Sequence, residues 1–85
     1  MKEFTYTIKD AIGIHARPAG QLAKLAKGLG STVKITKGDK TVNATQLMKV
    51  MGMGVKCGDT VTFTIEGGDE EASAQAVKEF MENNL

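Results

Sequence analysis

The sequence predicts an α+β fold, an open-faced sandwich in which a four-stranded antiparallel sheet carries three helices on one face, in the order β-α-β-β-α-β-α. Three observations favour this class. The chain has 85 residues, a length that suits one domain over residues 1–85. Four segments alternate apolar and polar residues, and three others have a one-sided apolar pattern. Such helices can cover the apolar face of the sheet and leave its other face in water.

The first strand is expected over residues 2–8, where every second residue is aromatic or aliphatic. A helix is expected to begin just after His15 and to extend to about Lys27, because apolar residues there follow the i, i+3, i+4, i+7 spacing. This stripe consists of Leu22, Leu25, Ala26 and Leu29. Gly28 and Gly30 then end the helix.

A β-hairpin is expected next. Its first strand covers residues 32–37, with Val33 and Ile35 facing inward. Its second strand covers residues 41–43. The dipeptide Gly38-Asp39 lies between them and has the composition of a tight turn.

The remaining elements are a helix, a strand and a helix. A short helix is expected over residues 46–51, and a strand over residues 60–66 alternates apolar residues with threonines before a Gly-Gly pair. Asp69 is a good N-cap for the last helix, and Glu70 and Glu71 suit its first turn. The buried face of this helix is expected to hold Ala76, Val77 and Phe80.

Composition excludes several classes of protein. No apolar run approaches the ~18 residues that cross a bilayer, and the first residues lack the apolar segment of a secretory signal. We therefore expect a cytoplasmic protein without membrane insertion. Cys57 is the single cysteine and has no adjacent histidine to activate it, which favours a structural or neutral role. No Cys or His cluster has metal-site spacing, so we expect no metal and no cofactor.

The formal net charge of +1 hides a strong asymmetry. Up to Gly58 the chain has ten basic and three acidic residues, and after it one basic and seven acidic residues. Such a chain suits a negatively charged partner met at one end, although a solvated surface with accidental segregation is the commoner explanation of the asymmetry alone. A polyanion-binding module is an alternative of a different class. The single arginine, the absence of an aromatic residue on the basic helix and the acidic last third weigh against nucleic acid.

Residues 13–19 read Gly-Ile-His-Ala-Arg-Pro-Ala and contain the only histidine, arginine and proline. His15 lies where a loop gives way to a helix, and Pro18 suits the first helical turn because its missing N–H is not needed there. The first N–H groups of a helix lack intrahelical partners and carry the positive end of its dipole, so they form an anion site. Arg17 adds a planar donor fork for phosphate oxygens.

The chemistry that fits this cluster is phosphoryl transfer. An imidazole is substantially neutral and nucleophilic at pH 7, and its attack on phosphorus forms a phosphohistidine that passes the group on. One helix face, opposite the leucine stripe, collects Arg17, Gly20, Lys24 and Lys27 at i, i+3, i+7 and i+10. A lone histidine is more often a surface or capping residue. The grouping of His15 with this cationic helix start favours a chemical role.

The motif and the whole chain resemble the HPr family, the histidine-containing phosphocarriers of the bacterial phosphoenolpyruvate-dependent sugar phosphotransferase system. The resemblance implies that His15 accepts a phosphoryl group at Nδ1 from phospho-enzyme I, which phosphoenolpyruvate charges. It also implies that His15 donates this group to enzyme IIA domains of sugar permeases. Arg17 would contact the phosphoryl group and the partner's carboxylates, and Pro18, with Ala16, would shape the phosphate-binding helix start.

The resemblance describes a carrier and co-substrate, not an independent catalyst, and we expect a monomer. A regulatory paralogue that acts in nitrogen control shares His15 and stays an alternative. Partner selectivity separates the two.

The short helix and its flanks hold more apolar residues than such a helix can bury. Val50 is expected in the core. Leu47, Met48 and Met51 share a face and are expected on an exposed docking surface, because methionine suits interfaces with several partners. The resemblance assigns this surface to enzyme I and enzyme IIA. Around it we expect Gly20, Lys24, Lys27, Gln46 and Lys49.

Many HPr proteins carry a regulatory serine at the start of this helix, the target of a dedicated kinase. The matching residue here is Gln46, whose amide cannot be phosphorylated. The hydroxyl of Thr45 is one residue earlier and faces about 100° away. We therefore predict no such regulation.

Overall fold

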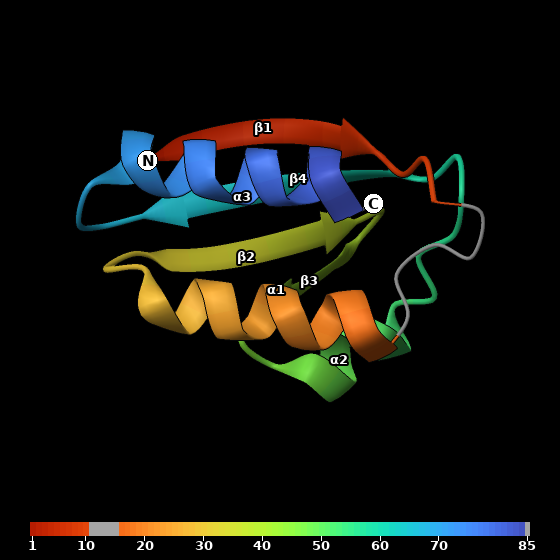
Figure 1. Cartoon of the computed structure of the whole chain (residues 1–85). Helices are drawn as coiled ribbons and strands as arrows, with labels where there is room; N and C mark the ends of the chain where they lie inside the picture. The colour runs from red at the N-terminus through yellow and green to blue at the C-terminus, as the bar shows by residue number, and fades with distance from the viewer. Residues whose placement is uncertain (11–15, 85) are drawn as a thin grey trace.

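The computed structural model describes residues 1–10 and 16–84. Seven elements follow the predicted order, and each predicted boundary lies within one residue of the observed one (Figure 1). The elements are β1 (Lys2–Thr7), α1 (Ala16–Gly28), β2 (Thr32–Lys37), β3 (Lys40–Asn43), α2 (Leu47–Gly52), β4 (Thr60–Glu66) and α3 (Glu70–Asn84).

The four strands form one antiparallel sheet in the order β1-β4-β2-β3. Figure 1 shows α1 and α3 side by side along one face of this sheet, with α2 next to α1. The fold class predicted from the sequence, an open-faced sandwich with its helices on one face, is confirmed.

Alternation along the strands places the core between the sheet and the helices. In β4 the side chains of Val61, Phe63 and Ile65 are fully buried, and the threonines between them are not. Phe63 is paired with Phe4 in β1 and with Ile35 in β2. The rings of Phe4 and Phe63 stack with their centroids 5.2 Å apart. Burial of one such side chain contributes about 1.5–3 kcal/mol.

The opposite face of the sheet carries a row of threonines. Thr5, Thr62, Thr36 and Thr41 are successive cross-strand partners, one from each strand. The hydroxyls of Thr36 and Thr41 are 2.9 Å apart, at hydrogen-bond distance. Threonine is β-branched and favours the extended backbone, while its hydroxyl tolerates water. The open face therefore supports the sheet without presenting a large apolar surface.

α1 is anchored by small and branched side chains. Ala19, Leu22 and Ala26 are at most 3% exposed, whereas Leu25 and Leu29 are half-buried. The predicted stripe therefore faces the core, with its centre shifted toward the alanines. Small side chains at this position let the helix backbone lie close to the sheet.

α3 begins as predicted. The Ala72 N–H donates a hydrogen bond to Oδ1 of Asp69 at 3.1 Å, the bond that defines an N-cap. The Glu70 carboxylate is 2.7 Å from the N-terminal amine and accepts a hydrogen bond from the Gly67 N–H at 2.9 Å. These two contacts, the amine first, lower the pKa of Glu70.

The predicted buried face of α3 is partly wrong. Val77 is fully buried as expected, but its buried neighbours on this face are Ser73 and Met81. Ala76 and Phe80, which the sequence pattern placed there, are only half-buried.

Two hydrogen bonds from distant parts of the chain accompany this rotation of α3. The Ser73 hydroxyl is 2.8 Å from that of Ser31, so a polar side chain is satisfied on the buried face. The Tyr6 hydroxyl donates to the Met81 carbonyl at 3.0 Å. Both partners lie more than 40 residues away in the sequence, beyond the reach of a local pattern.

Two turns require glycine. Gly38 has φ +61°, the conformation of the first central residue in a type II′ hairpin turn. Gly68 has φ +60°, and a Cβ atom there would collide with the carbonyl of Gly30. The chain segments before β2 and after β4 therefore approach each other closely only because position 68 has no side chain.

The connection between α2 and β4 is tied to the sheet. Asp59 lies 3.0 Å from the Lys37 ammonium and accepts a hydrogen bond from the Lys56 N–H at 2.9 Å. The backbone bond from Lys56, followed by the contact with Lys37, lowers the pKa of Asp59. Ile8 exchanges backbone hydrogen bonds with Gly58 and Asp59, both at 2.9 Å. The end of β1 is thereby fixed.

Candidate functional site

The predicted nucleophile directly precedes a described helix. Residues 11–15, and His15 with them, lie outside the described part of the chain. α1 begins at Ala16, as the sequence predicts, and runs for 13 residues to Gly28, one residue beyond the predicted end. The first backbone N–H groups of such a helix have no intrahelical acceptor and carry partial positive charge, which suits an anion.

The first turn of α1 has one anchored side and one open side. Pro18 is buried and Ala19 is 0% exposed, so this turn is held against the core. Arg17 is exposed, and its guanidinium makes no hydrogen bond or ion pair with the other described residues. Its donor fork is therefore available to an external anion two residues after His15.

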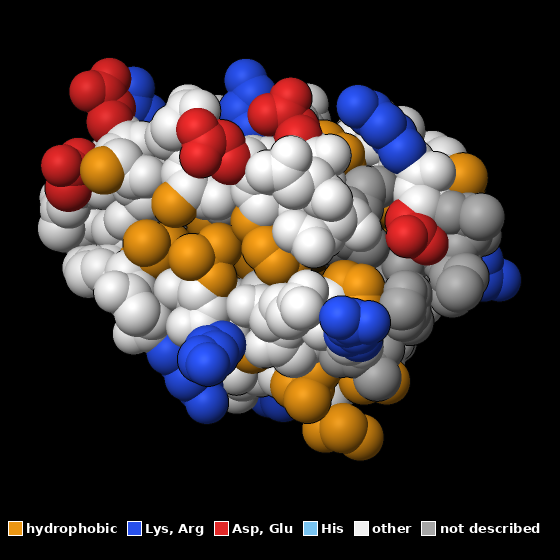
Figure 2. All heavy atoms as spheres, in the orientation of Figure 1, with side chains coloured by type: hydrophobic (Ala, Val, Ile, Leu, Met, Phe, Trp, Pro, Cys, Tyr) orange, Lys and Arg blue, Asp and Glu red, His pale blue; other side chains and the backbone are white. Residues whose placement is uncertain are grey.

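The face of α1 that continues from Arg17 is cationic. Lys24 and Lys27 are exposed, and Gly20, which lies between Arg17 and Lys24, is half-buried. Neither α1 nor α2 contains an acidic residue. In Figure 2 the lower half of this view, where Figure 1 shows α1, carries lysine and arginine side chains and no acidic ones. An approaching negative partner would meet no fixed acidic group on either helix.

α2 divides its apolar residues between the core and solvent. Val50 is fully buried, as predicted, while the Met48 side chain is 76% exposed. Leu47 and Met51 were expected to be exposed, but both are half-buried and pack against the core. The exposed apolar surface of α2 is therefore narrower than predicted and is centred on Met48. Gln46 and Lys49 are exposed beside it.

An Asx turn positions the start of α2. Oδ1 of Asn43 accepts hydrogen bonds from the Thr45 N–H at 2.9 Å and from the Thr45 hydroxyl at 2.7 Å. The Thr45 hydroxyl is thus engaged, and Gln46 makes no side-chain cap of the helix. Asn43 was predicted only as the last residue of a strand, with no role in the site. The Asn-x-Thr pattern after a strand is a turn signal that could have identified it.

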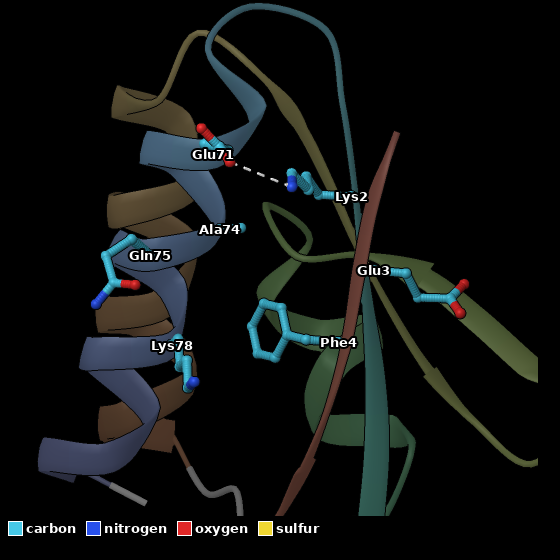
Figure 3. A pocket seen from close by; sticks show the side chains of 7 residues that line it. All are labelled: Lys2, Glu3, Phe4, Glu71, Ala74, Gln75 and Lys78. Carbon is cyan, nitrogen blue, oxygen red and sulfur yellow. Dashed lines mark ion pairs between the residues drawn. The ribbon is translucent and has the colours of Figure 1, made fainter.

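The hollow drawn in Figure 3 lies between β1 and α3, and no residue of the predicted site lines it. The Phe4 ring and the Ala74 methyl group form its apolar part, and the Lys2 ammonium is 3.4 Å from the Glu71 carboxylate at its rim. The lining residues are Lys2, Glu3, Phe4, Glu71, Ala74, Gln75 and Lys78.

Residues 1–10 and 16–84 lack two further kinds of feature. This part of the chain holds no group of three His, Cys, Asp or Glu side chains placed to bind a metal ion. None of its helices has the length and apolar character needed to span a bilayer.

Comparison with known proteins places these features in a family. The family model for the PTS HPr component phosphorylation site matches residues 2–83. The phosphocarrier protein HPr of Mycoplasma capricolum subsp. capricolum is 38% identical over 81 residues, which cover 95% of this chain and 91% of that protein.

Solved structures show the same fold. The crystal structure of HPr-C-His from Thermoanaerobacter tengcongensis superposes with a TM-score of 0.91 at 38% identity, covering 98% of this chain and 93% of that one. An HPr dimer from the same organism gives a TM-score of 0.76 at 38% identity, over 98% and 95% of the two chains.

Proposed function

Because this chain belongs to the HPr family of phosphocarriers of the phosphotransferase system, we propose that His15 accepts a phosphoryl group from phospho-enzyme I. His15 then donates the group to the enzyme IIA domains of sugar permeases. The observation that carries this proposal is the exposed Arg17, which has no partner among residues 1–10 and 16–84, in the first turn of a helix that begins directly after His15.

The chemistry is an in-line displacement at phosphorus. A nitrogen of the His15 imidazole attacks, a P–N bond forms, and the bond to the donor breaks with its electron pair leaving on the donor. The N–H groups at the start of α1 and the Arg17 guanidinium stabilise the charge on the equatorial oxygens. Transfer to enzyme IIA repeats the displacement with His15 as the leaving group.

The docking surface consists of the exposed face of α2 with the cationic face of α1. Met48 supplies an apolar centre, and Leu47 and Met51 extend it at the margin. The polar and charged residues around this centre are Gly20, Lys24, Lys27, Gln46 and Lys49. Cations around an apolar patch speed the encounter with an acidic partner, and a thioether adapts to partners of different shape.

The test is phosphorylation by enzyme I and phosphoenolpyruvate, followed by intact mass spectrometry. We expect one phosphate, lost in acid and retained in alkali, and none in His15→Ala. A phosphate that survives acid, or that persists in His15→Ala, would contradict the proposal.

The protein is proposed to act as a cytoplasmic monomer, in contrast to the solved HPr dimer. Light scattering at several protein concentrations, before and after phosphorylation, measures this state directly. A mass of two chains that is independent of concentration would contradict it.

A further inference from the structure

We propose that Met48 is an oxidation site at which hydrogen peroxide switches off partner docking. This inference rests on the proposed function, because it assumes that α2 meets enzyme I. It concerns regulation of that surface, not the phosphoryl chemistry at His15.

The five methionines of the chain differ widely in access to solvent. Met48 and Met1 are 76% and 73% exposed, Met51 is half-buried, and Met53 and Met81 are 6% and 0% exposed. Reaction with peroxide requires that the oxidant reach the sulfur atom, so Met48 and Met1 are the sites expected to react first.

The two exposed methionines occupy different parts of the molecule. Met1 lies beside the start of α3, where its amine is 2.7 Å from Glu70. Met48 lies on α2, which Figure 1 shows next to α1 and away from the N-terminus. Oxidation of Met1 therefore serves as an internal control for the effect of Met48 oxidation on docking.

Hydrogen peroxide is the only co-reactant that oxidation of Met48 needs. The Met48 sulfur donates an electron pair to one peroxide oxygen, an S–O bond forms, the O–O bond breaks, and water leaves. The thioether is oxidised by two electrons and the peroxide is reduced. Methionine sulfoxide reductase with a dithiol restores the thioether, as the thiols become a disulfide and the oxygen leaves as water.

The consequence falls on docking and not on folding. A sulfoxide is strongly polar, so covering it with an apolar partner leaves an acceptor without water. The Met48 side chain is already mostly in solvent in the free protein, so the same change leaves the core untouched. We expect the KM for this protein in phosphorylation by enzyme I to rise about tenfold, with the thermal unfolding midpoint unchanged.

The experiment uses the full chain with Cys57→Ser, since the exposed Cys57 thiol also reacts with peroxide. The protein is treated with peroxide, catalase removes the excess, and peptide mass mapping locates each added oxygen. Phosphorylation by untreated enzyme I is then measured for treated, untreated and reductase-repaired samples. Met48→Leu is treated in parallel and compared only with its own untreated sample.

We expect oxygen on Met48 and Met1, a raised KM that the reductase reverses, and no effect of peroxide on Met48→Leu although its Met1 is oxidised. An unchanged KM with Met48 oxidised, a Met48 that stays reduced while Met1 reacts, or a lowered unfolding midpoint would overturn the inference alone. Failure of the untreated protein to accept phosphate would overturn the proposed function, and the inference with it.

Discussion

The two long helices differ in whether the positive charges beside their first turns are paired. Beside α3, the N-terminal amine is 2.7 Å from Glu70, and the Lys2 ammonium is 3.4 Å from Glu71. On α1, Arg17 is exposed and has no charged partner among the described residues. Paired surface charges stabilise a fold weakly, whereas unpaired ones are available to a ligand. The difference is that the cations at the start of α3 are engaged within the fold, whereas the Arg17 guanidinium has no charged partner among the described residues and is accessible from outside.

The largest effect is expected at Arg17. Arg17→Ala should slow phosphoryl transfer from enzyme I about 100-fold, because a donor to the transferring oxygens is lost. Stability should be unchanged, since the side chain has no partner among the described residues. Rapid-quench kinetics and urea unfolding measure the two quantities.

Lys2→Ala is the matched control for Arg17→Ala, because it removes a cation that is paired with Glu71 at the start of α3. It should leave transfer at the wild-type rate. Equal rates for the wild type and Arg17→Ala would remove Arg17 from the site.

A smaller effect is expected from the lysines of α1. Lys24→Glu combined with Lys27→Glu should lower the association rate with enzyme I about tenfold at low salt, and less at high salt, because exposed charges steer encounter and are screened. Lys34→Glu with Lys78→Glu makes the same change in net charge on other elements. If both pairs slow association equally, net charge and not the α1 face would be responsible.

A weaker effect again concerns the pH dependence of stability at two paired carboxylates, Glu70 at the start of α3 and Asp59 just before β4. The contacts of Glu70 with the N-terminal amine and of Asp59 with the Lys56 N–H lower the pKa of each carboxyl below its ordinary value, 4.5 for Glu and 3.8 for Asp. Their contribution to stability is therefore complete above these values and lost as pH falls through the lower folded-state pKa. Urea unfolding between pH 7 and pH 2 should show a shallower loss of stability in Glu70→Gln and Asp59→Asn than in the wild type. If the free energy of unfolding of the variants fell with pH as steeply as that of the wild type, these pairs would contribute nothing to stability.

No effect is expected from the serine kinase that acts on other HPr proteins. Gln46 offers no hydroxyl, and the Thr45 hydroxyl is bonded to Asn43 at 2.7 Å. Incubation with this kinase and ATP should leave the intact mass unchanged, while Gln46→Ser restores a possible acceptor as the positive control. Phosphate on Thr45 with loss of docking would contradict this prediction.

The local alternation of apolar and polar residues was enough to predict the four strands. Alternation identified β2 and β4 to the residue, since an amphipathic strand shows its buried face in the sequence. The start of α1 followed from Pro18 and the leucine stripe. These features depend only on neighbouring residues.

Features that depend on distant partners were not predictable in the same way. Ser73 faces inward on α3 because Ser31 supplies a hydrogen bond, and no local pattern favours burying a serine. Leu47 and Met51 are half-buried because α2 packs against α1 and β3. The residue pattern of α2 alone does not show how closely these two elements approach it. The site itself was inferred from a residue type and its neighbours. His15 lies outside the described residues, so its role stays a prediction.

The row of threonines across the open face of the sheet has a consequence for how copies of this protein behave when crowded together. Stacking of two sheets requires apolar surfaces that exclude water, whereas this row presents hydroxyls, and those of Thr36 and Thr41 already bond to each other. Even in a concentrated solution, copies of this protein are therefore expected to associate little through the open face of the sheet.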